Sequence, residues 1–330
     1  MGCYDRGYEL RFILRFFIAF FVLFVVWIGI VFFQTGRDTR MSQWVYDVYV
    51  KKTAIADGIK GKKLVIVAGS NALFGCDSKM LSEAFDIPVV NYGVNAGVYL
   101  PYILYKARGV INSGDIVVLP LEYSMYNYDG VPNIQMIDYI FSRDRDAFFS
   151  LSAIEQFYMV WNITFKRLYD GYMTLGGTRV TAGLYGAHNV DRYGDQIGAT
   201  KKAKSQAIVD ELNRLKANHF GEEYNKDSLG WKYIEKFVKW CDARGVKTVF
   251  MPSTLLKFDS YFSEDKERWF YENLANEVRK KGWVYVGNPY DYMYDIKYYF
   301  NTDFHLTDEG RKMRTKRMIF DLKSTSYPTL

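Results

Sequence analysis

The chain has 330 residues, of which 49% are hydrophobic and 24% are charged, and its 43 basic and 37 acidic residues give a formal net charge of +6. This length suits one large α/β domain with a sizeable core, or two small domains. The charges are mixed and no dense Lys/Arg tract occurs, so the usual signature of a nucleic-acid-binding protein is missing. Cys3, Cys76 and Cys241 are isolated from one another, and the sequence supports neither a disulfide framework nor a zinc motif.

An uncharged apolar segment occupies residues 16–33, FFIAFFVLFVVWIGIVFF. Eighteen helical residues span about 27 Å, close to the thickness of the hydrocarbon core of a bilayer. Arg11 and Arg15 precede the segment and Arg37 and Arg40 follow it, so the flanking charge is nearly balanced. The segment is long for a signal peptide, and no small-residue cleavage site follows it. We therefore expect a single-pass anchor in the cytoplasmic membrane, with the large domain on the extracytoplasmic side.

A helical stem is expected directly after this anchor, which together with a short N-terminal tail covers residues 1–40. Residues 41–60 have apolar positions at helical spacing. One face of the expected helix collects Trp44, Val45, Val48, Tyr49 and Lys52.

Residues 61–330 alternate between short apolar runs and amphipathic segments, a pattern typical of a doubly wound α/β domain. Strands are predicted at 63–68, 87–92, 115–121, 247–252 and 283–287. Helices are predicted at 78–85, 98–111, 228–245, 263–282 and 307–322, the first and last with Asp77 and Thr307 as N-caps. We expect a three-layer α/β/α fold with a mainly parallel sheet, which binds its ligand at the carboxyl ends of the strands.

Residues 124–226 interrupt this alternation and are too long to be a simple loop. They contain predicted helical segments at 147–170 and 200–219, on either side of a glycine-rich stretch at 176–198. We expect a helical cap that is inserted over the carboxyl edge of the sheet and grips a substrate or a partner.

Gly69-Ser70-Asn71 directly follows the first predicted strand, at a position that opens onto the ligand-binding crevice of such sheets. The serine could be a nucleophile, part of a phosphate-binding turn or a helix cap. No phosphate-loop or dinucleotide-binding glycine pattern surrounds it, which makes the phosphate interpretation weak. A nucleophilic serine needs a base. The sequence offers three histidines for this role, His188, His219 and His305.

His305 lies in the segment YYFNTDFHLTDEG, on the loop that precedes the last predicted helix. Asp303 is two residues before it and Asn301 is four residues before it. A serine, a histidine and a carboxylate that orients the histidine form the triad used in acyl transfer. We favour Asp303 as the orienting residue, with Asn301 as the second choice. The competing interpretation is that His305 is a structural residue bonded to the backbone.

Two short motifs, AGSN at 68–71 and DFHL at 303–306, resemble the SGNH (GDSL-type) hydrolase superfamily. The resemblance implies that Ser70 is the nucleophile. The segment NYGVNAG at 91–97 is then similar to the family motif whose glycine N–H helps to bind the oxyanion, which makes Gly93 the candidate donor. The usual third motif, with its oxyanion-binding asparagine, is replaced by LEYSMYNYDG. The further candidates for oxyanion or substrate binding are Asn71, Asn91, Glu122 and Asn127.

Within that superfamily, a chain with an N-terminal anchor is similar to the membrane-tethered branch. This branch includes the DltD-type proteins of teichoic-acid D-alanylation and proteins that O-acetylate exported polysaccharides. The resemblance implies a serine O-acyltransferase or esterase that acts on a cell-envelope or exported polysaccharide. It also implies a multi-pass membrane-bound O-acyltransferase as partner. The alternative is a non-catalytic assembly subunit of such an acyltransferase or of a polysaccharide export complex. The scattered histidines favour no metal site, and we expect no cofactor.

Overall fold

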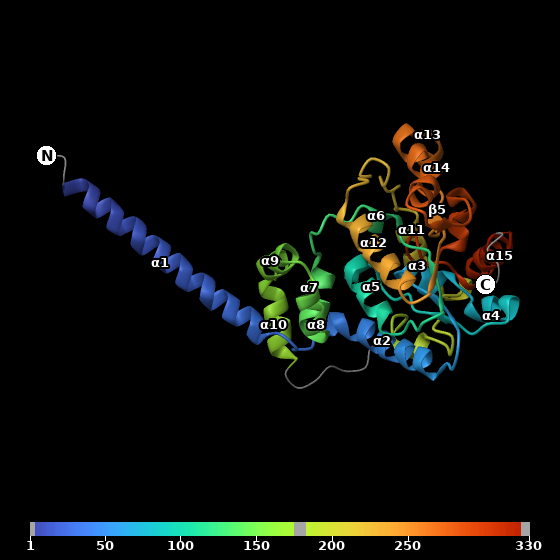
Figure 1. Ribbon diagram of the computed structural model, residues 1–330, viewed down its shortest axis with the longest axis horizontal. Helices are drawn as coiled ribbons and strands as arrows, with labels where there is room; N and C mark the ends of the chain where they lie inside the picture. The colour runs from blue at the N-terminus through green and yellow to red at the C-terminus, as the bar shows by residue number, and fades with distance from the viewer. Residues whose placement is uncertain (1–3, 175–182, 325–330) are drawn as a thin grey trace.

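The computed structural model describes residues 4–174 and 183–324. Helix α1, Tyr4–Phe33, extends away from the rest of the molecule, which is folded around a five-stranded sheet (Figure 1). Among the described residues one segment, Gly7–Phe33, is long and apolar enough to cross a membrane, with a mean hydropathy of 3.0 over its most apolar part. The apolar segment expected at 16–33 is therefore the second half of a longer helix. Residues 176–182 of the glycine-rich stretch lie outside the described residues.

The five predicted strands are confirmed, and all of them pair in parallel in the order β2-β1-β3-β4-β6. They are Leu64–Ile66 (β1), Val89–Asn91 (β2), Ile116–Leu119 (β3), Lys247–Phe250 (β4) and Val284–Tyr285 (β6). A separate two-stranded ladder joins Leu255–Leu256 (β5) to Met293–Tyr294 (β7). Because the strand order reverses beside β1, a crevice opens at the carboxyl end of that strand.

Both faces of the sheet are buried, which explains why the strands read as unbroken apolar runs. Val65 and Val67 belong to a core shared with α2, α5, α12 and α14, whereas Leu64 and Ile66 belong to a second core shared with α4 and α15. The alternation follows from the two-residue period of a strand. These helices are Arg40–Gly58 (α2), Ser78–Phe85 (α4), Tyr99–Arg108 (α5), Leu229–Asp242 (α12), Asp265–Lys280 (α14) and Asp308–Lys323 (α15).

The two predicted N-caps are confirmed. Asp77 accepts a hydrogen bond from the Met80 N–H at 3.1 Å, at the start of α4. Thr307 accepts one from the Gly310 N–H at 3.3 Å, at the start of α15. Each cap satisfies an N–H group that has no partner within the helix. The second cap fixes the point at which the loop that carries His305 enters α15.

Helix α2 is the expected stem, and it packs onto the sheet domain instead of standing apart from it. Val48, Tyr49 and Lys52, which share the predicted face, are at most 1% exposed. The buried Nζ of Lys52 donates a hydrogen bond to the carbonyl oxygen of Gly93, and burial lowers the pKa of this lysine to about 7. The segment that follows α1 is therefore part of the domain core.

The insertion folds into short helices whose bounds differ from the predicted ones. The predicted helix at 147–170 is broken into α8, α9 and α10, and the one at 200–219 reduces to α11 and a 3₁₀ turn. Helix α7, which the sequence reasoning misses, is capped by Asn133 through the Met136 N–H at 2.8 Å. Figure 1 shows α7–α10 between α1 and the sheet domain, so this part of the insertion lies against the end of α1.

The helices of the insertion and the remaining short helices complete the fold. They are Tyr123–Tyr126 (α6), Ile134–Arg143 (α7), Arg145–Ser150 (α8), Ala153–Trp161 (α9), Phe165–Met173 (α10), Gln206–Leu212 (α11), Ser260–Ser263 (α13) and the 3₁₀ turns Ala96–Val98, Ala187–Asn189, Lys201–Ala203, Pro289–Tyr292 and Ile296–Tyr298.

Candidate active site

Ser70 is the first residue of helix α3, Ser70–Gly75, which begins just after β1. The turn from strand to helix is tight. A Cβ on Gly69 would lie 2.5 Å from Oε1 of Glu122 and 2.6 Å from the backbone nitrogen of Ala96, so only glycine fits before the serine. The sequence therefore places Ser70 just beyond the carboxyl end of β1, the first strand of the sheet, as predicted.

Glu122 fixes the backbone of this turn through hydrogen bonds. Its carboxylate accepts one hydrogen bond from the Gly69 N–H and one from the Asn71 N–H, both at 3.0 Å. The side chain is 2% exposed, and burial raises its pKa although the hydrogen bonds that it accepts lower it. Ser70 lies between the two donors. Glu122 is thus a positioning residue for the serine.

The imidazole of His305 lies beside the helix that begins with Ser70. It stacks on the ring of Phe74, with the two ring centroids 4.0 Å apart and the planes 12° from parallel. Phe74 is four residues after Ser70, so the two side chains share a face of α3. His305 is 6% exposed. The structure therefore brings together the serine and the histidine that the sequence singles out.

Asn301, and not Asp303, is the residue bound to the histidine. Oδ1 of Asn301 lies 2.8 Å from Nδ1 of His305. The carboxylate of Asp303 instead accepts a hydrogen bond from Nδ2 of Asn218 at 2.6 Å. The first choice from the sequence is therefore wrong on this point, because a residue of the insertion binds the aspartate and the loop presents the asparagine.

The hydrogen bonds of Asn301 determine which nitrogen of His305 carries the proton. Nδ2 of Asn301 donates to the hydroxyl of Tyr185 at 2.7 Å, so Oδ1 is the end that faces the imidazole. Because this oxygen is an acceptor, Nδ1 of His305 is the protonated nitrogen and Nε2 keeps its lone pair. Burial lowers the pKa of His305 to about 3. The ring is therefore neutral at neutral pH, as a general base must be.

A cavity of about 310 Å³ opens beside these groups. Ser70 and His305 both line it, together with residues of α2 and α7. The other lining residues are Met41, Ser42, Trp44, Val45, Asn95, Val98, Gln135, Asp138, Tyr139 and Tyr185. Half of the lining side chains are Met, Val, Trp or Tyr, and the other half are polar or titratable. Apolar walls with polar groups between them are found in pockets for small molecules.

Gly93 is not placed as a free oxyanion donor. Its N–H donates to Oδ1 of Asn91 at 3.0 Å. A Cβ on Gly93 would lie 2.6 Å from the carbonyl oxygen of Gly69 and 2.7 Å from the Cβ of Ala72, so this glycine allows the loop to pack closely against α3. The expected role for Gly93 does not agree with this geometry, because its N–H is already bonded.

Asn91 binds the backbone of α3 and does not line the cavity. Its Nδ2 donates to the carbonyl oxygen of Ala72 at 2.7 Å and to Oδ1 of Asp195 at 2.8 Å. Asp195 also accepts hydrogen bonds from the N–H and the hydroxyl of Ser78. Burial raises the pKa of Asp195 to about 6. Asn91 and Asp195 thus link β2, α3, α4 and the insertion.

Asn71 and Asn127 also lie outside the cavity lining. Nδ2 of Asn71 donates to the carbonyl oxygen of Pro120 at 2.9 Å, and its Oδ1 accepts from the buried Arg314 at 2.8 Å. Asn127 donates to the carbonyl oxygen of Phe220 at 2.9 Å. These two side chains hold neighbouring segments together, and neither is placed to bind a substrate.

Asn95 is the cavity residue that the sequence reasoning misses. Its Oδ1 accepts a hydrogen bond from the Gly97 N–H at 2.7 Å, and within the described residues its amide nitrogen has no acceptor. The Ser70 N–H likewise makes no hydrogen bond to the described protein, whereas the N–H groups on either side of it do. Both groups can therefore donate to an oxyanion. The signal for Asn95 is its place in the same NYGVNAG motif that suggests Gly93.

No metal centre accompanies the site in the described residues, where no group of three or more His, Cys, Asp and Glu side chains could hold an ion. Comparison with known proteins adds no independent assignment: no family matches the chain, and no curated protein is significantly similar to it.

Proposed function

We propose that this protein is a membrane-anchored serine O-acyltransferase or esterase, with Ser70 as nucleophile, His305 as general base and Asn301 as the residue that orients the base. One observation carries the proposal: Ser70 and His305 line the same cavity, while Nδ1 of His305 is held by Asn301. A serine beside an oriented, neutral imidazole is the arrangement that activates a hydroxyl at neutral pH.

The reaction proceeds in two halves. The hydroxyl oxygen of Ser70 attacks the acyl carbonyl carbon, and its proton passes to Nε2 of His305. The oxyanion that forms accepts hydrogen bonds from the Ser70 N–H and from the amide nitrogen of Asn95. The imidazolium then protonates the leaving oxygen, and an acyl-serine remains. In the second half, a glycan hydroxyl or water gives its proton to the neutral imidazole and attacks the acyl carbon of the acyl-serine. The imidazolium then returns the proton to the Ser70 oxygen as its bond to the acyl group breaks, which frees Ser70.

The topology of the sheet supports the proposal. The strand order β2-β1-β3-β4-β6 corresponds to the 2-1-3-4-5 order of doubly wound sheets. A serine at the end of β1 and a histidine just before the last helix are where the SGNH hydrolases carry theirs, by the resemblance stated above. We therefore propose a three-layer α/β/α domain of that type.

The acceptor is proposed from the same resemblance and from the position of α1. A long apolar N-terminal helix suits a protein held at the membrane, with the cavity on the extracytoplasmic side. An envelope or exported polysaccharide would then supply the attacking hydroxyl, and a multi-pass membrane-bound O-acyltransferase would supply the acyl group. Transfer requires that water be excluded from the acyl-enzyme, and the aromatic wall of Trp44, Tyr139 and Tyr185 suits this task.

The proposal is tested in cells by the acylation of the envelope polymer. Ser70→Ala and His305→Ala should both abolish polymer acylation while the proteins accumulate as the native chain does. Asp303→Asn serves as the matched control, and it should retain acylation, since the aspartate contacts Asn218 and not His305. Unchanged acylation in the Ser70 and His305 variants would instead favour a non-catalytic assembly subunit.

A further inference from the structure

Helix α9 carries an apolar stripe on its exposed side. At the i, i+3, i+4 and i+7 spacing of one helix face lie Ile154, Phe157, Tyr158 and Trp161. These side chains are 39–68% exposed, whereas Met159 on the inner side is fully buried. An amphipathic helix normally turns its apolar stripe toward the core. The stripe on α9 faces the other way, and an exposed apolar face of this kind marks an interaction surface.

Helix α10 repeats the pattern. Its exposed face collects Phe165, Tyr169, Tyr172 and Met173, which are 61–79% exposed. The inner side carries the buried Arg167 and Gly171. Trp27 of α1 contacts both helices, and we term the exposed side chains of the two stripes the α9–α10 apolar face. On α9 the single acidic residue, Glu155, is 2% exposed and accepts hydrogen bonds from Tyr128 and Tyr233. On α10, Lys166 and Asp170 form an ion pair that flanks the stripe.

Direct contacts fix this face beside α1. Nε1 of Trp27 donates to the carbonyl oxygen of Val160 at 3.3 Å, and the Trp27 ring lies edge-on to Phe165 with centroids 5.4 Å apart. Trp27 is six residues before Phe33, the end of α1. At 1.5 Å per residue, the two helices therefore reach about 9 Å back along α1 from its end.

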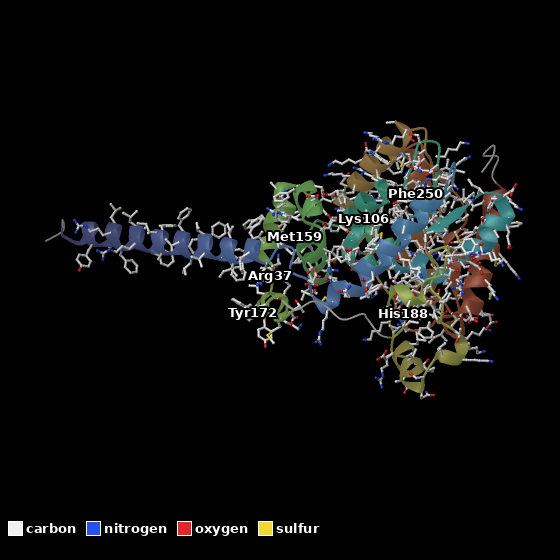
Figure 2. All side chains as sticks on the ribbon, turned by 90° about the horizontal axis from the view of Figure 1, so that it is seen from below. Arg37, Lys106, Met159, Tyr172, His188 and Phe250 are labelled. Atoms are coloured by element: carbon white, nitrogen blue, oxygen red, sulfur yellow. The ribbon has the colours of Figure 1, made fainter. Side chains whose placement is uncertain are left out.

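A buried polar cluster prevents the insertion from swinging away. Arg167, which is 3% exposed, donates to Oε1 of Gln34 and to the carbonyl oxygen of Arg37, both at 3.1 Å. The Gly36 N–H donates to the carbonyl oxygen of Phe141 at 2.6 Å. Figure 2 shows Arg37, Met159 and Tyr172 together at this junction. The position of α1 thus determines the position of the α9–α10 apolar face.

We propose that the α9–α10 apolar face lies in the interface of the lipid bilayer, with its apolar side chains at the boundary between headgroups and acyl chains. The inference rests on the proposed anchoring by α1. If α1 spans the bilayer, the contacts with Trp27 place α9 and α10 at the depth of the membrane surface. Trp and Tyr are enriched at that depth, and helices with one apolar face bind there.

The lipid is favoured over a protein partner because the chain itself sets the depth of the face. If the α9–α10 apolar face lies at a fixed depth, the catalytic cavity lies at a fixed height above the membrane. Asp138, which lines the cavity, forms an ion pair with Arg167 at 3.4 Å and accepts a hydrogen bond from Thr39 at 2.5 Å. Asp138 therefore connects the cavity wall to the cluster that holds the insertion to α1. The site is presented close to the lipid surface, where a membrane-borne acyl donor is within reach.

The test uses the full chain in nanodiscs of phosphatidylethanolamine and phosphatidylglycerol. In a Cys3→Ser background, where Cys76 and Cys241 are buried, single cysteines replace Phe157 or Tyr169 and carry the fluorophore NBD. Quenching is measured with doxyl-labelled lipids and with aqueous iodide. NBD on Val22→Cys in α1 shows whether the anchor lies in lipid. NBD on Lys312→Cys in α15 is the control for a surface exposed to water.

We expect NBD at both positions on the α9–α10 apolar face to be quenched by lipids labelled near the headgroup and protected from iodide. Labelled Lys312→Cys should show the opposite. If labelled Val22→Cys is quenched by lipid while both α9–α10 positions are quenched only by iodide, the inference is overturned and the anchor stands. Protection of the face in native membranes but not in pure lipid nanodiscs would also overturn it, in favour of a protein partner. Since no step measures acyl transfer, these outcomes are independent of the catalytic proposal.

Discussion

Oδ1 of Asn301 lies 2.8 Å from Nδ1 of His305, while the carboxylate of Asp303 is turned to Asn218. An amide oxygen can fix the tautomer of an imidazole as a carboxylate does, but it adds no negative charge beside the ring. This agrees with the lowered pKa of His305, for which burial is the cause and no anion compensates. His305 is therefore a base whose ring is oriented by Asn301, while no neighbouring anion stabilises its protonated form.

Asn301→Ala should reduce ester hydrolysis by about 10²- to 10⁴-fold, the range that general-base catalysis contributes. The reason is that Nδ1 loses its acceptor and the ring loses its orientation. The rate is measured with a p-nitrophenyl ester and the full-length protein in detergent. Asp303→Asn is the matched control and should lose little. Equal losses in the two variants would show that Asp303 acts on the histidine after all.

Asn301→Asp should move the acidic limb of the pH–rate profile to higher pH. A carboxylate next to Nδ1 favours the imidazolium and raises the pKa of His305 from its lowered value. The free base is then protonated at a pH where the native base is still neutral. The pH dependence of kcat/KM gives the apparent pKa. A profile identical to that of the native protein would mean that residue 301 does not face the ring.

The stability of the protein should fall as the pH is lowered below about 6.5, in part through His305. In the unfolded chain the histidine takes up a proton near its ordinary pKa of about 6.5, whereas in the folded protein it does so only near 3. Between these two pH values the unfolded state binds more protons than the folded state. The contribution of His305 to stability is therefore complete above pH 6.5 and is lost on acidification, at up to about 1.4 kcal/mol per pH unit. The apparent Tm of His305→Asn should therefore fall less steeply than that of the native chain over this window. Parallel curves would contradict the assignment.

Asn95→Ala should lower kcat by about 10²-fold with a smaller effect on KM, as expected for a group that binds an oxyanion only in the transition state. Asn127→Ala serves as the control, because Asn127 is bonded to Phe220 and lies outside the cavity lining. If Asn127→Ala has the larger effect on kcat, the assignment of Asn95 is wrong.

Glu122→Gln should slow acylation of Ser70 and lower the free energy of unfolding by about 1–3 kcal/mol. A carboxylate accepts from both Gly69 and Asn71, whereas an amide turns an NH₂ group toward one of these donors. Acylation is followed by burst kinetics, and unfolding by urea. Normal burst kinetics in this variant would show that Glu122 does not hold the serine in position.

The sequence predicts the sheet well because the strands are buried on both faces. Runs such as 63–68 and 115–121 have no polar alternation, and no helix of that length would be stable alone. Ser70 and His305 are found for a related reason. Topology places the end of β1 at the crevice, and the chain offers few histidines that could serve as a base.

The partners of these residues are harder to predict, since they depend on long-range contacts. Asp303 and Asn301 differ by two positions in one loop, and the choice between them is made by Asn218, which lies 85 residues away. Gly93 and Asn95 share a motif, and the hydrogen bond from Gly93 to Asn91 decides which can serve an oxyanion. The docking of α9 and α10 on α1 likewise follows from Trp27 and Arg167, whose partners no local pattern reveals.

The most direct test of the account is covalent labelling of the full-length protein with a fluorophosphonate, followed by mass spectrometry of the modified peptide. The account predicts a phosphonyl group on Ser70, no labelling in His305→Ala, slower labelling in Asn301→Ala and an unchanged rate in Asp303→Asn, with all variants folded by thermal melting. An unlabelled Ser70 in the folded native protein, or labelling that does not depend on His305, would contradict it.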